Sequence, residues 1–250
     1  MAEDFDGVVA SSGGDYTTLQ SADDALDAGA YTVYVKNGTY AAGLTVSTND
    51  ARWVFEPGTT VQAGITFSGS NIECIFMPGC DVQGLLTMSG THCHVKCMNG
   101  CNFDGILMSG AEGYFHGGGW DTISDTDSTN QALDIQAVDC IARCFTCQAT
   151  SGGEGGNDTI VVAAGGDRAV LEYIRVTDSD DAGIDILGDD VLVYGCYILG
   201  ADGDGINIGA PRARVMGNFI TACADDGIQV AAAGDNSVIV ANSVKNITGS

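Results

Sequence analysis

The chain has 250 residues, of which 45% are hydrophobic, so it can bury the core of one large domain or two small ones. No apolar run reaches about 18 residues, and the acidic start, MAEDFDG, lacks an apolar stretch, so we expect neither a membrane span nor a secretory signal peptide. The net charge of −24, from 33 acidic and 9 basic residues, argues against nucleic-acid or anionic-lipid binding and suits a halophilic source.

The first predicted element is a short helix. We treat residues 1–15 as an N-terminal arm and residues 16–250 as one domain. Within 17–28, Leu19, Ala22, Ala25 and Leu26 have a spacing that places them on one helical face, and Gly29 follows. We expect this helix to cap the open end of the strands that come after it, because an uncovered strand edge must be protected.

A small residue followed by a short aliphatic strand then recurs along the chain. Most of the repeats are spaced by 20 to 22 residues, and the middle intervals of 27, 27 and 24 residues are longer. Two further short strands fall in each repeat, and helical periodicity is absent. Three strands joined by turn residues are typical of one coil of a parallel β-helix. We therefore predict an all-β, single-stranded parallel β-helix of about nine coils, which begin at Gly43, Gly64, Gly84, Gly105, Ala132, Thr159, Gly183, Gly205 and Gly227.

These repeats resemble the pectin-lyase-like right-handed parallel β-helix superfamily over about residues 15 to 250. The entry segment YTTLQSADDALDAGAYTVYVKNGTY is similar to the family's opening helix, strand and Val-x-x-Gly-x-Tyr turn. The resemblance implies a right-handed coil. It leaves function open, because this superfamily includes lyases, hydrolases, epimerases, adhesins and phage tail spikes.

Acidic residues precede the repeats of the C-terminal half. The spacing places Asp158, Ala182, Asp204 and Asp226 in equivalent positions, and Asp181 with Asp225. Such a column repels itself, and Ca²⁺ or salt relieves the repulsion. The candidate Ca²⁺ ligands are Asp181, Asp202, Asp204, Asp225 and Asp226. The alternative is that these acids cap backbone N–H groups at the corners of a solvated face.

Catalytic motifs are not recognisable, and no catalytic residue is assigned. DSDDAGIDI and GADGDGINI resemble loosely the first two motifs of polygalacturonase-type hydrolases. The position of the family's third motif holds Ala222-Cys223-Ala224 without a histidine, and the expected Arg-x-Lys is missing. This departure puts hydrolase activity in doubt.

Ten cysteines raise a question of metal binding. HCHVKCMNGC, residues 92 to 101, has the residue types of a zinc site. Cys93 and Cys97, however, alternate with residues of the opposite strand face and align with inward positions of earlier repeats. We expect buried, reduced thiols, with zinc and a disulfide as the alternatives.

The long middle intervals predict two loops, at 116–130 and 148–158. Loops on a rigid scaffold are where binding is usually found. In the first of them an aromatic ring and several carboxylates are suited to a sugar ring and its hydroxyls. The candidate glycan-binding residues are His116, Trp120, Asp121, Asp125 and Asp127. The alternative is that Trp120 packs against the rod or a neighbouring subunit.

We favour a structural protein of a virion, as a tail spike, tail fibre or capsid decoration of a phage or archaeal virus. It would assemble in the host cytoplasm, as a homo-oligomer with a trimer favoured, and contact other virion proteins and a host glycan. The exposed last coil requires a covering partner. The alternatives are a polysaccharide-degrading hydrolase or lyase, and an extracellular calcium-dependent adhesin. No cofactor other than Ca²⁺ is expected, nor is nucleic acid or membrane insertion.

Overall fold

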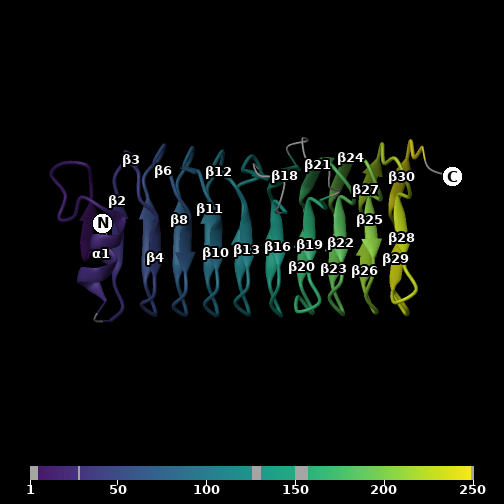
Figure 1. Cartoon of the computed structure of the whole chain (residues 1–250), viewed down its shortest axis with the longest axis horizontal. Coiled ribbons are helices and arrows are strands. Elements are labelled where there is room, and N and C mark those ends of the chain that lie inside the picture. The colour runs from purple at the N-terminus through teal and green to yellow at the C-terminus, as the bar shows by residue number, and fades with distance from the viewer. Residues whose placement is uncertain (1–4, 28, 126–130, 150–156, 249–250) are drawn as a thin grey trace.

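The computed structural model describes residues 5–27, 29–125, 131–149 and 157–248. The chain winds into a rod in which three parallel sheets run along the length, with the two termini at opposite ends (Figure 1). Each turn contributes one short strand to each sheet, so neighbouring strands in a sheet come from successive turns. No helix of the described residues is long and apolar enough to cross a membrane.

We call the three sheets A, B and C. Sheet A contains, in spatial order, β1 (Gly7–Val9), β2 (Thr32–Val35), β5 (Arg52–Phe55), β8 (Glu73–Phe76), β11 (His94–Cys97), β14 (Tyr114–His116), β17 (Ile141–Arg143), β20 (Val170–Glu172), β23 (Leu192–Tyr194), β26 (Arg214–Met216) and β29 (Val238–Val240).

Sheet B follows sheet A in each turn. It contains β3 (Thr39–Tyr40), β6 (Thr60–Val61), β9 (Asp81–Val82), β12 (Asn102–Phe103), β15 (Thr122–Asp125), β18 (Thr146–Ala149), β21 (Arg175–Ser179), β24 (Tyr197–Ala201), β27 (Phe219–Thr221) and β30 (Ser243–Lys245).

Sheet C completes each turn. It contains β4 (Leu44–Val46), β7 (Ile65–Phe67), β10 (Leu86–Met88), β13 (Ile106–Met108), β16 (Leu133–Ile135), β19 (Ile160–Val162), β22 (Ile184–Ile186), β25 (Ile206–Ile208) and β28 (Ile228–Val230). The nine predicted repeat starts each lie directly before one of these strands or one residue earlier. Within the described residues the sheets hold 11, 10 and 9 strands, so the predicted parallel β-helix is confirmed and has about ten turns rather than nine.

Alternating side chains explain why the coils stack. In a strand such as Ile184-Asp185-Ile186, the two isoleucines are fully buried and the middle residue faces outward. Stacking repeats this pattern, so the interior becomes columns of like side chains. Rings of successive turns meet in one of these columns, for example Phe55 and Phe76 with centroids 4.7 Å apart. One coil cannot bury its apolar side, but each coil covers the next.

The N-terminal end differs from the prediction in its details. The helix α1 runs over Leu19–Leu26, with Thr18 as its N-cap, and lies against the first turns of the rod as expected of a cap (Figure 1). Ala25 is exposed, and Asp23 is buried instead, where its carboxylate accepts a hydrogen bond from the Tyr31 hydroxyl. Residues 7–9, which we expected in an arm, form β1 and pair with β2 in sheet A, and the side chain of Val9 is buried in the core.

The cysteines are free, and nine of the ten are buried. Cys93 and Cys97 face inward while His94 faces outward, so the residues of HCHVKCMNGC do not converge on one point. Buried thiols donate instead to backbone carbonyls of the preceding turn, as Cys101 Sγ does to Met77 O at 3.3 Å. The prediction of buried thiols is therefore confirmed.

Candidate functional site

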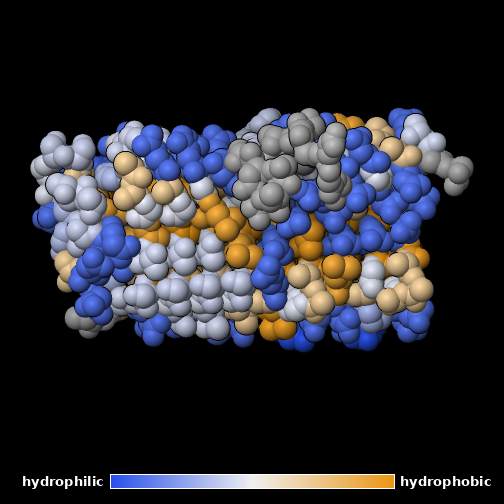
Figure 2. All heavy atoms as spheres, in the orientation of Figure 1, coloured by the Kyte–Doolittle hydropathy of each residue, from blue (hydrophilic) through white to orange (hydrophobic). Residues whose placement is uncertain are grey.

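The outer face of sheet C is polar in the C-terminal half of the rod. Asp134, Asp185, Asn207 and Gln229 are central residues of β16, β22, β25 and β28, with buried aliphatic residues on both sides of the first three. The strand register stacks Asp185 directly on Asn207, and Asn207 on Gln229. Hydrophilic residues gather over this half of the rod in the space-filling view (Figure 2).

Neighbouring side chains on this face bond to one another. Asn207 Nδ2 donates to Asp185 Oδ1 at 2.9 Å, and Gln136 Nε2 donates to Asp134 Oδ2 at 2.6 Å. Burial raises the pKa of both Asp134 and Asp185 above the ordinary value for a carboxyl group. Asp185, Asn207 and Gln229 therefore form a line at about one strand spacing of 4.8 Å per coil, and Asp134 lies two coils before Asp185, with Val161 between them.

Asp158 enters this face from the corner between sheets B and C. Its Oδ1 accepts a hydrogen bond from the Ala182 backbone N–H at 2.9 Å. Burial raises the pKa of Asp158 to about 7, and the negative charges of Asp185, Asp181 and Asp204 add to this effect. The carboxyl group of Asp158 is thus about half protonated near neutral pH.

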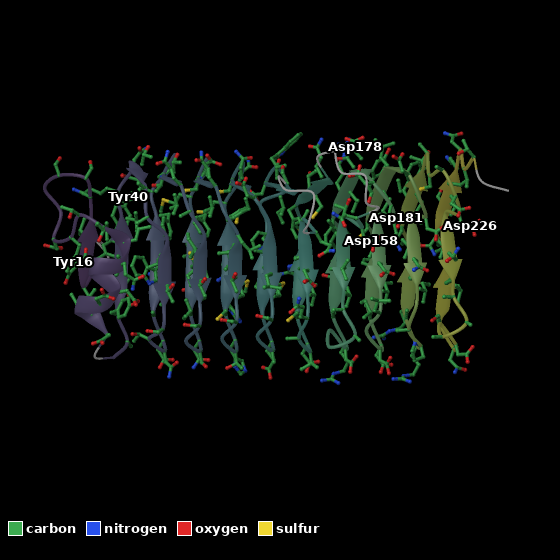
Figure 3. All side chains as sticks on the ribbon, viewed as in Figure 1. Tyr16, Tyr40, Asp158, Asp178, Asp181 and Asp226 are labelled. Atoms are coloured by element: carbon green, nitrogen blue, oxygen red, sulfur yellow. The ribbon has the colours of Figure 1, made fainter. Side chains whose placement is uncertain are left out.

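The predicted register of the corner acids is confirmed. Asp226 N–H donates to Asp204 Oδ1 at 2.9 Å, which repeats the bond between Ala182 and Asp158 two turns earlier. These acids therefore cap the corner N–H groups of the next coil, as the alternative interpretation expects. Figure 3 shows Asp158, Asp181 and Asp226 along this edge of the rod.

Three of the five candidate Ca²⁺ ligands come together. Asp204, Asp225 and Asp226 each place one carboxylate oxygen within 4.8 Å of the other two. The charge of Asp181 reaches this group, because it contributes to raising the pKa of Asp204. Asp202 lies elsewhere, in a hollow of about 270 Å³ bordered by Asp178 and Asp180. Oxygen donors in such a group suit a hard cation such as Ca²⁺.

The structure separates the candidate glycan-binding residues. His116 is half-buried on the outer face of sheet A, and Trp120 is 80% exposed at the corner between sheets A and B. Asp121 is fully buried, where it accepts hydrogen bonds from Cys101 N–H at 2.7 Å and from Gly118 N–H. It is therefore not available to a surface glycan.

Less can be said of the two remaining candidate glycan-binding residues, Asp125 and Asp127. Asp125 is the last residue of β15, so residues 122–125 belong to sheet B rather than to a loop. The side chain of Asp125 and the whole of Asp127 lie outside the described residues. In the second predicted loop, residues 148–149 likewise belong to β18, and residues 150–156 lie outside the described part.

Asp134 is not among the site residues predicted from the sequence. The signal was present, since Leu133-Asp134-Ile135 repeats the pattern of Ile184-Asp185-Ile186 and Ile206-Asn207-Ile208. A polar residue between two buried aliphatic residues of a coil faces outward on sheet C. The aliphatic–polar–aliphatic triplet is therefore the sequence signal for this outward position.

Comparison with known proteins establishes the fold. Residues 147–250 match the family model described as the right-handed β-helix region. No curated protein sequence matches the chain. The deglycosylated pectin methylesterase of Aspergillus niger is 15% identical, with a TM-score of 0.54, over 95% of this chain and 84% of that one.

Two other solved structures have lower scores. Rice weevil pectin methyl esterase is 10% identical, with a TM-score of 0.42, over 97% of this chain and 89% of that one. ORF18 of Geobacillus virus E2 is 11% identical, with a TM-score of 0.44, over 90% of this chain and 56% of that one. At these identities the likeness concerns the fold alone. The chain has a parallel β-helix fold, and residues 147–250 match the right-handed form.

Proposed function

We propose that this chain is the β-helical rod of a virion structure, such as a tail spike, tail fibre or capsid decoration, and that it binds a host-surface glycan along sheet C. The observation that supports binding is the row formed by Asp134, Asp158, Asp185 and Asn207. It extends over successive coils on an open face, which suits a linear polymer better than a small molecule. Carboxyl and amide groups are partners for sugar hydroxyls.

The virion setting is supported by the chemistry of the core. Ten free cysteines suit a protein that folds in a reducing compartment such as a host cytoplasm. A rod of stacked coils is rigid along its axis, and it holds a surface at a distance from its attachment point. We propose a homo-oligomer, with a trimer favoured, in contact with other virion proteins. Native mass measurement of the purified particle and its subunits tests this assignment.

Glycan binding is tested with surface polysaccharides immobilised as a panel. The double variant Asp185→Ala, Asn207→Ala is expected to weaken binding at least tenfold. The matched control is Thr66→Ala, Thr87→Ala, which alters outward residues of the same sheet in the N-terminal half. The proposal would be contradicted if the double variant and the control both bound the polysaccharides as tightly as the parent.

A second candidate function is carboxylate-dependent hydrolysis of a polysaccharide. The pKa of about 7 for Asp158, which burial and the neighbouring charge of Asp185 raise, is the feature that favours it. Hydrolysis of a glycosidic bond uses one protonated and one ionised carboxyl group, whose environments hold their pKa values apart. In this reading Asp158 donates a proton to the leaving oxygen as the glycosidic bond breaks, and the carboxylate of Asp185 takes a proton from the water that attacks the same carbon.

Release of reducing sugar from the same panel tests hydrolysis. Activity that disappears in Asp158→Asn and persists in Asp202→Asn would support the enzyme and displace the purely structural role. The variant Asp204→Asn examines the loosely similar motif of the polygalacturonase type. The absence of new reducing ends on every polysaccharide that the chain binds would exclude this function.

A further inference from the structure

The few basic residues of this acidic chain are concentrated on one side. Lys and Arg number nine in all, and four of them lie on strands of sheet A: Arg52, Lys96, Arg143 and Arg214. The three histidines lie on sheet A or in the turn before β11. No described strand of sheet C carries a Lys or Arg, so basic side chains are enriched on sheet A, where Glu73 and Glu172 pair with three of them.

Three of these side chains form a row across consecutive coils. The register pairs Lys96 with His116, and His116 with Arg143. They face outward, because the preceding residue of each strand, such as Phe115, is fully buried. Nitrogen donors thus repeat once per coil, at about the 4.8 Å strand spacing.

The two end residues of the row, Lys96 and Arg143, form ion pairs, and the central residue, His116, forms none among the described residues. Lys96 Nζ lies 2.9 Å from Glu73, and Arg143 Nη1 lies 3.8 Å from Glu172. Among the described residues, the imidazole of His116 has no hydrogen-bond or ion-pair partner and contacts the Tyr114 ring, and the buried Nε of Arg143 has no acceptor. Burial lowers the pKa of His116, and the charges of Arg143 and Lys96 lower it further. An anion placed beside His116 would complete this arrangement.

An aromatic surface adjoins the row. The guanidinium carbon of Arg143 lies 5.1 Å from the centroid of the Tyr114 ring, and the ring of His94 lies 5.5 Å away on the other side. His94, Tyr114 and Ile141 border a hollow of about 520 Å³. Two carboxylates also border the hollow, and both are paired: Asp139 with Arg168 at 2.7 Å and Glu112 with His92. The hollow is large enough for one or two sugar rings.

We propose that this part of sheet A binds an acidic saccharide, with a carboxylate or sulfate group held by His116 and Arg143 and a sugar ring packed on Tyr114. A planar guanidinium matches such anions with two parallel hydrogen bonds. Aromatic faces supply the contact for the ring.

Fluorescent tetragalacturonate, a sulfated heparin-derived tetrasaccharide and neutral maltotetraose serve as probes for binding to the full chain. We expect at least one acidic probe to bind and maltotetraose to bind at least tenfold more weakly. The preferred acidic probe tells carboxylate from sulfate recognition. Equal binding of maltotetraose, or no binding of either acidic probe at millimolar concentration, would overturn the proposal.

Matched variants separate a local site from the general effect of charge. Arg143→Gln is expected to weaken binding at least tenfold, whereas Arg214→Gln, which removes the same charge from the same sheet, leaves it unchanged. Tyr114→Leu weakens binding, and Tyr197→Leu, which removes a ring that lies 5.7 Å from Arg175 on sheet B, does not. Equal losses within either pair would refute the site, provided that thermal unfolding shows all four variants to be folded.

This site is independent of the one on sheet C. The double variant Asp185→Ala, Asn207→Ala should retain full affinity for the acidic probe. Loss of acidic-saccharide binding in that variant would place the ligand on sheet C and refute the site on sheet A. Failure of the sheet C proposal, in turn, leaves the expectation for Arg143→Gln unchanged.

Discussion

The side-chain oxygen of Asn218 accepts a hydrogen bond from the backbone N–H of Cys196, 2.8 Å away, in the coil that precedes it. Asn242 repeats this bond one coil later, with its Oδ1 2.9 Å from Asn218 N. Asp121 occupies the equivalent corner between sheets A and B and bonds Cys101 N in the same way. Buried side chains thus satisfy the N–H groups that the sharp turn removes from the ladder.

Asn218→Ala should therefore destabilise the rod by roughly 1–3 kcal/mol, because it leaves a buried N–H group without an acceptor. Asn218 is 1% exposed, whereas Asn242 lies half-buried in the last coil, so Asn242→Ala is expected to cost less. Urea unfolding monitored by circular dichroism measures both free energies. An equal effect at the two positions would contradict the dependence on burial.

Gly90→Ala should be among the most damaging glycine substitutions. A Cβ atom at Gly90 would lie 1.8 Å from the backbone oxygen of Gly69 in the preceding coil, and backbone atoms cannot move aside as a side chain can. We expect a loss of at least about 1–3 kcal/mol, the usual cost of overpacking. Gly29→Ala is the control, since no atom lies within 4 Å of its Cβ position. Its unfolding free energy should change by less than about 0.5 kcal/mol.

The coil register could be predicted from the sequence because it depends on a local pattern. Isoleucine pairs such as Ile184 and Ile186 must both face inward, and a shift of one residue would expose them, so the repeat spacing determines which residues stack. The same reasoning placed Asp204 and Asp226 in one column. The first turn was missed because β1, which opens sheet A, has no partner on sheet C and hence no repeat glycine.

The partners of the acids could not be predicted in the same way. Asp121 and Asp202 are both acids close to glycines, yet the first is buried at a corner and the second is exposed. The difference arises from the backbone path, which turns Asp121 toward the N–H groups of Cys101 and Gly118. The row of Lys96, His116 and Arg143 was also hidden, because these residues lie 20 and 27 positions apart in the sequence. Only the register of sheet A brings them together.

The stability of the chain should fall as the pH rises from about 4 to about 7. Asp158 has a pKa of about 7 in the folded state, above the ordinary value of a carboxyl group, so the native state binds more protons than the unfolded state in this window. The free-energy cost of ionising Asp158 in the folded state is absent below the pKa that this residue has in the unfolded state. It is complete above about pH 7. Asp158→Asn removes it and should be more stable than the parent at pH 8, on the order of 1–2 kcal/mol after allowance for solvent screening.

Chemical unfolding at pH 4, 6 and 8 checks this expectation. Asn at position 158 keeps an acceptor for Ala182 N–H, so the two proteins should have similar stability at pH 4. Asp202→Asn is the control, because it removes an exposed acid from the same half of the rod and should leave the pH profile of the parent almost unchanged. A parallel profile for Asp158→Asn and the parent would show that Asp158 is ionised at no cost.

Calcium should raise the thermal midpoint through Asp204, Asp225 and Asp226. Their oxygens lie within 4.8 Å of one another, and a divalent ion between them replaces mutual repulsion by attraction. A ligand that binds only the folded state at a hundred times its Kd stabilises by about 2.7 kcal/mol. For a chain of this size each kcal/mol corresponds to roughly 2–4 °C. Scanning calorimetry with Ca²⁺ and with chelator measures the shift.

Two controls make this expectation specific to the three-residue group. Sodium chloride at the same ionic strength screens the whole column of acids but cannot bridge three carboxylates, so its effect should be smaller. Asp226→Asn should abolish the calcium increment, whereas Asp202→Asn should keep it, because Asp202 lies in a separate hollow with Asp178 and Asp180. An equal shift with sodium, or a calcium shift that survives Asp226→Asn, would mean that the acids only cap the corners of the rod.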